Sequence, residues 1–360
     1  MNVAEQIVAQ LVDAGVHRIY GIVGDSLNPI VDAVRKTGGS KKGGIDWIHV
    51  RHEEAAAFAA SAEAQLTGKL AVCAGSCGPG NLHLINGLYD ANRTGAPVLA
   101  IASHIPSVQI GSTYFQETHP DRIFEECSVY NELISSAAQS PRTVNSAIRH
   151  AVGLGGVSVI TLPGDVSDLK AVEHVPTYAP ARPATLAPNP ADIDEAAALL
   201  NKADKVAIFA GAGVEGAHDE VIALADALKA PIGHSLRGKH FIQYDNPFDV
   251  GMTGLLGYGA AAEGMNDADV LILLGTDFPY DQFLPDTPTI QVDTHAEKLG
   301  RRTDVGLAIH AQVKPFIEAL LPHLRAGRSD SFLKSKIKKH SEIMHAPVGA
   351  YTRNVEKMRP

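Results

Sequence analysis

DWIHVRHEEAAAFAASAEAQL, residues 46–66, runs from a short apolar stretch into an alanine-rich segment, with two carboxylates at the junction. The alternation in residues 46–50 suits a strand buried on both faces, and the strong helix formers of residues 55–64 predict a helix. Glu53 and Glu54 then lie in the first helical turn. Both acids can simply complement the helix dipole. We single out Glu53 as the candidate functional residue. Glu54 lies about 100° further round the helix, so we expect it to face solvent or a salt-bridge partner.

The same change from strand to helix recurs along the chain. Such alternation predicts an α/β fold with doubly wound parallel-sheet domains. The expected strands are residues 17–23, 45–50, 70–74, 98–103 and 157–162, followed by residues 206–210, 270–275 and 290–293. Residues 165–192 are rich in proline and lack apolar periodicity, which is typical of a linker. We therefore expect a first domain at residues 1–182, a second at residues 183–325 and a polar, lysine-rich connecting tail at residues 326–360.

Composition excludes several classes of function. The 360 residues carry 31 basic and 40 acidic side chains with no basic stripe, which argues against nucleic acid as a partner. The N-terminal segment has no basic leader, and no apolar run approaches about 18 residues, so no transmembrane segment is expected. The three cysteines, Cys73, Cys77 and Cys127, cannot form a disulfide framework, which suits a cytoplasmic protein.

No metal site is expected from the sequence. Cys73 and Cys77 are not accompanied by a second ligand pair, so both are interpreted as packing residues. His52 and Glu53 begin a possible H-E-x-x-H pattern, but no second histidine follows at the required spacing. We therefore assign no metal ligands in this chain.

Four segments carry a resemblance to a known family: GDSLNPIVDAV (24–34), RHEEAAAFAASAEAQL (51–66), AVCAGSCGPGNLHLINGLYD (71–90) and ASHIPSVQIGSTYFQETHP (102–120). Over nearly its whole length the chain resembles the thiamine-diphosphate flavoenzymes called pyruvate oxidase or pyruvate:quinone oxidoreductase. The resemblance implies a thiamine-enzyme pyrimidine domain followed by a central FAD-binding domain.

The resemblance also implies roles for residues of the first domain. Glu53 matches the glutamate that bonds the aminopyrimidine ring of thiamine diphosphate and promotes loss of the C2 proton, a task that suits a partly buried acid. Pro79 and Asn81 match a turn that borders the same ring. Phe115 and Gln116 match residues on the path between thiamine and flavin, so we place them with Glu53 among the candidate catalytic residues.

The second domain offers two interpretations. The segment 211–216 is a formal G-x-G-x-x-G between a strand and a helix, but residues 230–234 supply no acid for a nicotinamide ribose. The resemblance instead implies FAD binding, with Arg237 as a cation for the pyrophosphate. The other expected contacts are Thr253, Gly254, Leu255, Leu256, Thr276, Asp277, Phe278, Pro279, Tyr280 and Asp293. Phe278 and Tyr280 can equally serve ordinary packing.

The chain departs from the family pattern at two places. Ala311 and Gln312 stand where relatives carry Gly-Asp, which puts one adenine contact and the affinity for FAD in doubt. Residues 1–360 also lack the Gly-Asp-Gly and Asn-Asn segments with which the family holds the diphosphate and Mg²⁺. We interpret the chain as truncated before that third domain and expect it to be inactive alone.

The complete enzyme would convert pyruvate to acetate and CO₂ and pass electrons through FAD to a membrane quinone. We expect a homo-oligomer, dimer or tetramer, with peripheral membrane association possible for the full-length enzyme. Two alternatives stay open: a two-domain FAD-binding protein without thiamine chemistry, and a fragment of an acetolactate synthase-like carboligase. Residues 102–120 favour the oxidase branch.

Overall fold

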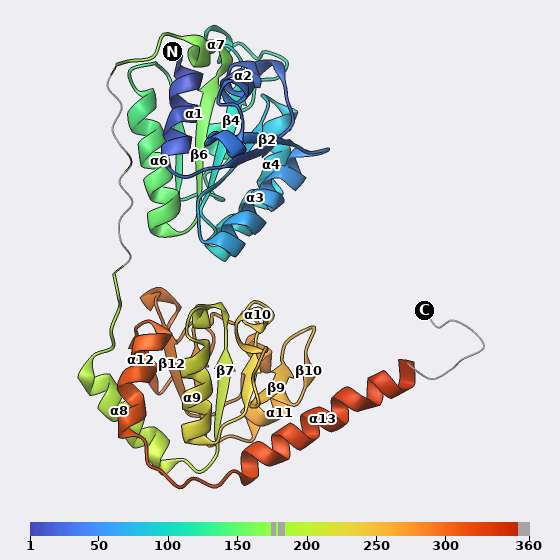
Figure 1. Cartoon of the computed structure of the whole chain (residues 1–360), viewed down its shortest axis with the longest axis vertical. Coiled ribbons are helices and arrows are strands. Elements are labelled where there is room, and N and C mark those ends of the chain that lie inside the picture. The colour runs from blue at the N-terminus through green and yellow to red at the C-terminus, as the bar shows by residue number, and fades with distance from the viewer. Residues whose placement is uncertain (174–177, 179–183, 352–360) are drawn as a thin grey trace, which may run out of the picture. The chain divides into compact units, whose positions relative to one another are not determined.

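The computed structural model describes residues 1–173, 178 and 184–351, with the backbone alone for residues 347–351. The chain divides into two compact units, Met1–Arg182 and Pro183–Pro360. Each unit is built on its own sheet with its own hydrophobic core (Figure 1). This is the two-domain α/β fold that the sequence predicts.

The first unit is a six-stranded parallel sheet in the order β2-β1-β3-β4-β6-β5. Helices α1, α2 and α6 supply one apolar layer, and α3 and α4 supply the other, so the sheet is doubly wound. The strands are β1 Arg18–Gly21, β2 Asp46–His49, β3 Ala71–Gly75, β4 Val98–His104, β5 Tyr130–Leu133 and β6 Val157–Pro163. The helices are α1 Val3–Asp13, α2 Asn28–Lys36, α3 Glu53–Thr67, α4 Pro79–Thr94, α5 Pro120–Ile123, α6 Ser140–Leu154 and α7 Gly164–Asp168.

Strand β2 corrects one expectation. It forms an edge of the sheet and pairs with β1 alone. Its residues are partly or fully exposed, so the prediction of a strand buried on both faces is wrong. The alternating pattern in residues 46–50 reports a strand correctly, but it cannot say where in the sheet that strand lies.

The second unit is a seven-stranded sheet in the order β10-β9-β8-β7-β11-β12-β13, parallel except for β10. Helices α8, α9 and α12 cover one face, and α11 and the start of α13 cover the other. The strands are β7 Val206–Ala210, β8 Ile232–His234, β9 Asp249–Met252, β10 Tyr258–Gly259, β11 Val270–Leu274, β12 Thr289–Asp293 and β13 Leu307–His310. The helices are α8 Pro190–Lys202, α9 His218–Leu228, α10 Lys239–Ile242, α11 Ala261–Asn266, α12 Val313–Leu320 and α13 Ser331–Tyr351.

Helix α13 lies where a connecting tail was expected. Its first turns are part of the second unit, because Phe332 and Leu333 are buried against the sheet and its helices. Lys336 is also buried and bonds Glu263 of α11 and Asp267, the residue directly after that helix. The lysine-rich composition therefore describes the outer face of a packed helix. The part of the linker and tail at residues 174–177, 179–183 and 352–360 lies outside the described residues.

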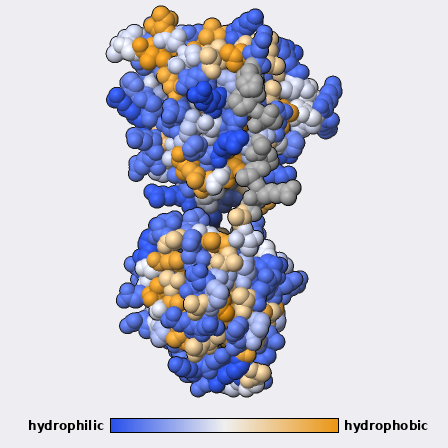
Figure 2. Space-filling model, turned by 90° about the vertical axis from the view of Figure 1, so that its left-hand side faces the viewer, coloured by the Kyte–Doolittle hydropathy of each residue, from blue (hydrophilic) through white to orange (hydrophobic). Residues whose placement is uncertain are grey.

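The surface carries no extended apolar band on the face drawn in Figure 2, where hydrophobic side chains form small groups among polar ones. Among the described residues, no helix combines the length and apolar character needed to cross a membrane.

Candidate functional site

Glu53 is the first residue of α3, directly after the sheet edge. His52 caps the helix, since its Nδ1 accepts a hydrogen bond from the backbone N–H of Glu54 at 3.2 Å. Glu53 is 8% exposed, whereas Glu54 is half-buried and bonds the Asn86 amide. The helix N-terminus stabilises negative charge at both positions. The two acids therefore differ in burial. Glu54 faces outward, as expected, and its partner is the Asn86 amide.

Close packing of α3 against α4 sets the surroundings of Glu53. Gly87 of α4 lies so near α3 that a Cβ there would be 2.5 Å from the Cβ of Ala57. His83 lies one helical turn before Gly87, and Glu53 lies one helical turn before Ala57. The two side chains meet, with 3.0 Å between Nδ1 of His83 and Oε2 of Glu53. His83 was not predicted as a site residue. The sequence signal that could have indicated His83 is its position one helical turn before Gly87. It also lies on the helix that follows the turn at residues 78–81.

The turn at residues 78–81 lies between Glu53 and Gln116. Gly78 has φ +69°, and a Cβ on it would be 3.2 Å from the Cβ of Gln116. A Cβ on Gly80 would be 3.2 Å from Oε1 of Glu53. The structure thus brings Glu53, His83, the glycine turn and Gln116 together. We call this group the Glu53 site.

Other predicted residues of the first unit have different surroundings. Asn81 is fully buried and donates from Nδ2 to the Ser103 carbonyl at 2.6 Å, so its side chain links α4 to β4. Pro79 is exposed at the start of α4. Phe115 is 81% exposed and contacts Tyr114.

The two carboxylate oxygens of Glu53 have different surroundings. One carboxylate oxygen, Oε2, is held by His83, while Oε1 faces the position that a side chain at residue 80 would fill. A Cβ at that position would also be 3.4 Å from the Cβ of Ser76, so glycine keeps a side chain from crowding Oε1. A charged diphosphate needs Mg²⁺ with oxygen ligands on a rigid turn, and no described residue at the Glu53 site provides such a set.

The predicted residues of the second unit gather at one edge of its sheet. Arg237 follows β8, residues 253–256 follow β9, residues 276–280 follow β11, and Asp293 ends β12. These four strands all run parallel to β7 in the same sheet, so their carboxyl ends share one edge. In open α/β sheets, ligands bind at this edge, where the strand order reverses. Here the reversal lies between β7 and β11. We call this group the carboxyl-edge site.

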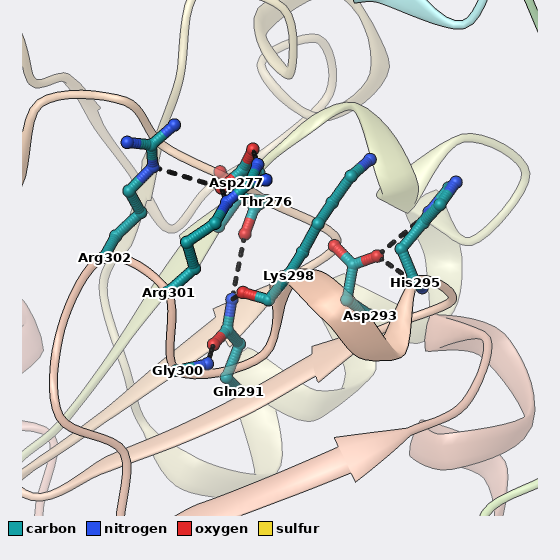
Figure 3. Close-up of polar contacts among 9 residues, drawn as sticks. All are labelled: Thr276, Asp277, Gln291, Asp293, His295, Lys298, Gly300, Arg301 and Arg302. Atoms are coloured by element: carbon teal, nitrogen blue, oxygen red, sulfur yellow. Dashed lines mark hydrogen bonds and ion pairs between the residues drawn. The ribbon is translucent and has the colours of Figure 1, made fainter.

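Polar side chains tie the loops of the carboxyl-edge site together (Figure 3). Asp277 forms ion pairs with Arg301 and Arg302, the latter at 3.2 Å. Gln291 accepts from the Gly300 N–H at 2.8 Å and donates to the Thr276 carbonyl at 3.2 Å. The sequence did not single out these two arginines or Gln291. Asp277 is therefore engaged within the protein.

Asp293 is 7% exposed and accepts a hydrogen bond from the His295 N–H at 2.9 Å. Its other carboxylate oxygen has no bond among the polar contacts drawn in Figure 3. Thr253 and Thr276 are buried at the ends of their strands, whereas Leu255 and Leu256 are largely exposed. The edge therefore combines a buried carboxylate with an exposed apolar loop.

Phe278 is a packing residue. It is 5% exposed and meets Phe209 edge-on at 5.0 Å between ring centroids. Tyr280 packs edge-on against it, 5.5 Å away. Gly254, at φ +114° in the loop after β9, lies close to both rings. A Cβ on Gly254 would be 3.3 Å from the Phe278 ring and 3.4 Å from the Tyr280 ring. Of the two alternatives for Phe278, the structure favours core packing.

Two further sequence features acquire structural explanations. Gly211 and Gly213 pack directly on the backbone of Gly275, where a Cβ on either would come within 2.6 Å. These glycines therefore allow neighbouring loops to meet, which weakens the nicotinamide interpretation. Gln312 donates its N–H to the Leu186 carbonyl and accepts from the Leu186 N–H with Oε1. It holds the segment before α8 in place.

Comparison with known proteins gives two family matches. The model of the N-terminal TPP binding domain of thiamine pyrophosphate enzymes matches residues 1–123, and that of the central domain matches residues 193–320. An uncharacterized 42.6 kDa protein in the isoamylase 3′ region of Pseudomonas amyloderamosa is 54% identical over 335 residues, which cover 92% of this chain and 83% of that protein.

Enzymes with assigned names are more distant. Pyruvate oxidase of Lactiplantibacillus plantarum is 32% identical over 335 residues, 90% of this chain and 54% of the enzyme. The acetolactate synthase isozyme 1 large subunit of Escherichia coli is 31% identical over 332 residues, 90% of this chain and 58% of the enzyme. The chain thus spans little more than half the length of these two relatives.

Proposed function

Because the chain belongs to the thiamine pyrophosphate enzymes, with their N-terminal and central domains, we propose that it forms the pyrimidine-binding and FAD-binding parts of a pyruvate:quinone oxidoreductase. The net reaction is pyruvate plus water to acetate, CO₂, two protons and two electrons, and a membrane quinone takes up the electrons. The observation that carries the proposal is Glu53, a buried carboxylate with one oxygen fixed and the other open beside a glycine turn.

In this mechanism Glu53 binds and orients the aminopyrimidine. His83 holds Oε2, so Oε1 is the oxygen that would accept a hydrogen bond from a ring nitrogen. Gly80 permits the ring to approach, and Gln116 lies on the far side of the turn. Burial of Glu53 excludes water from this contact and strengthens it. When bound, thiamine diphosphate supplies a carbon nucleophile for a 2-oxo acid, and FAD supplies a two-electron acceptor.

The carboxyl-edge site is the proposed FAD site. Asp293 is placed to accept hydrogen bonds from a ribose, and the backbone of residues 253–256 at the same edge would border the cofactor. Figure 3 shows the Lys298 side chain projecting between the Asp277 group and Asp293, where a cation would face a pyrophosphate. Arg237 lies on the loop after β8 at the same edge.

Acetolactate synthase-like carboligation is the second candidate, because enzymes of that name match the chain about as well as pyruvate oxidase does. Both would use pyruvate and the Glu53 site, and they differ in the product. We also propose that the complete enzyme is a cytoplasmic homo-oligomer, dimer or tetramer, that associates peripherally with the membrane to reach quinone.

The adjacent glutamates provide a matched test of the thiamine role. In the protein that carries this chain together with a diphosphate-binding domain, we expect Glu53→Gln to reduce pyruvate-dependent dye reduction by about 10²–10⁴-fold, the usual contribution of an acid–base residue. Glu54→Gln should change the rate by less than about threefold, since Glu54 faces outward. Bound FAD should be equal in both variants.

The products and the flavin content separate the alternatives. Acetate with dye reduction supports the oxidase, whereas acetolactate without dye reduction supports the carboligase. A flavin absorption spectrum in the purified 360-residue chain would support FAD binding, and saturable binding of a nicotinamide cofactor in its place would contradict it. We expect the 360-residue chain by itself to bind FAD and to show no pyruvate turnover, because its sequence lacks the diphosphate and Mg²⁺ segments. Turnover by that chain alone would contradict this expectation.

A further inference from the structure

We propose that His52, Glu53 and His83 form a binding site for a transition-metal ion of the zinc class. Their ligand atoms all lie within 4.8 Å of one another. The set contains two imidazoles and one carboxylate, which is a ligand combination found in catalytic zinc sites that keep an open position for water. The sequence could not show it, because His83 lies 30 residues after Glu53 on a different helix.

Two of the three ligands are already near the spacing that an ion requires, and the third has to turn toward them. Nδ1 of His83 and Oε2 of Glu53 are 3.0 Å apart, close to the roughly 3.3 Å expected for two ligands about 2.0–2.2 Å from one zinc ion in a tetrahedral site. The His52 ring stacks on His83 with 4.2 Å between centroids, so it lies beside this pair but has to rotate out of the stack before its nitrogen can point at the same ion. Both histidine side chains are nearly half exposed, at 49% and 44%, which gives an ion a path from solvent.

Two features oppose binding. The ion would sit at the positive end of the α3 dipole, and His52 would lose the hydrogen bond from the Glu54 N–H. The charge of Glu53 offsets the first, and the second is a single bond at a partly exposed cap. We therefore expect affinity in the micromolar range rather than that of a closed structural site.

The ligand types also predict selectivity. Imidazole suits Zn²⁺, Cu²⁺ and Ni²⁺, whereas Mg²⁺ requires oxygen ligands in an octahedral arrangement. The proposed site is therefore distinct in chemistry from a diphosphate-bound Mg²⁺. If the proposed function of Glu53 holds, zinc and the aminopyrimidine compete for the same carboxylate, and zinc inhibits the complete enzyme.

Calorimetric titration of zinc chloride into the 360-residue chain tests the site directly. We expect one binding event that His83→Asn and Glu53→Gln each weaken by at least about tenfold. The controls are His17→Asn, an exposed histidine of the same unit, and Glu54→Gln, the neighbouring acid. Both should bind zinc as the parent chain does, and magnesium chloride should give no saturable heat.

Equal zinc affinity in the parent chain, His83→Asn and Glu53→Gln would overturn the proposal, provided that circular dichroism shows all three folded. So would a tenfold loss in Glu54→Gln with none in Glu53→Gln. Competition with thiamine diphosphate in the complete enzyme is a separate measurement. Zinc binding without such competition would leave the metal site standing and count against Glu53 as the aminopyrimidine partner.

Discussion

At the scale of single residues, Glu53 and Glu54 show that two adjacent acids can have different environments. Both lie in the first turn of α3, but Glu53 is buried beside His83, while Glu54 reaches outward to Asn86. Either carboxylate can interact favourably with the positive end of the helix dipole. Only Glu53 combines that position with burial and a glycine turn, so the two residues form a matched pair for mutation.

The cysteines allow a prediction at the same scale. Burial raises the pKa of Cys73 to about 12 and that of Cys127 to about 11, so neither is a thiolate at neutral pH. Because the thiolate is the reactive form, we expect the native protein to resist iodoacetamide at both positions, and at the buried Cys77. Mass spectrometry after timed alkylation measures this. Full alkylation should follow in denaturant, and fast reaction at Cys73 in native protein would contradict the structure.

At the scale of elements, the contact between α3 and α4 positions the Glu53 site. We predict that Gly87→Ala lowers the free energy of unfolding by about 1–3 kcal/mol, because its Cβ would overlap Ala57 and force the helices apart. Gly153→Ala is the matched control. It lies in α6 with no atom within 4 Å of the added carbon.

Chemical denaturation of the first unit measures both variants. Gly153→Ala should be neutral or stabilise by up to about 1 kcal/mol, since alanine is favoured over glycine in a helix. Equal effects of the two substitutions would mean that the helix contact does not constrain residue 87.

Helix α13 gives a second prediction for elements. Lys336 places a buried ammonium 2.8 Å from Glu263 and 2.5 Å from Asp267, and so ties α13 to α11. Lys336→Met should destabilise the second unit by about 1–2 kcal/mol. This is less than the loss of one partner of a fully buried ion pair would cost, because both carboxylates are partly exposed to solvent.

Lys339→Met, at an exposed position of α13, should stay within about 0.5 kcal/mol of the parent in the same urea titrations. No loss of stability in Lys336→Met would show that α13 is not held to the second unit by this contact.

At the scale of the whole molecule, each unit contains a buried histidine that ties stability to pH. Burial lowers the pKa of His104 in the first unit and of His234 in the second, although Asp249 partly opposes the effect at His234. In the unfolded chain both titrate near about 6.5. Below that pH the unfolded state binds more protons than the folded state, so stability falls as the pH is lowered.

Thermal unfolding between about pH 8 and pH 5 tests this. We expect Tm to decrease towards acid, and the slope to become shallower in His104→Asn and His234→Asn. The exposed His17→Asn should keep the parent slope. A Tm that rises on acidification would contradict the burial of these histidines.

The sequence by itself determined the α/β class, the central strands of both sheets and the helix that begins at Glu53, because these depend on local apolar periodicity and helix propensity. Short strands such as β5 and β13 have too little pattern to detect, and α13 was hidden by its lysines. The family models support the two domains, whereas the roles of the individual site residues stay predictions.

Only the tertiary structure decided which residues meet. It placed β2 at a sheet edge, linked Asn81 to Ser103, packed Phe278 against Phe209, and set His83 against Glu53. The physical reason is that each of these outcomes depends on contacts between segments far apart in the chain. The Glu53 site exists because Gly87 lets two helices approach closely, and that distance is a property of the packed pair.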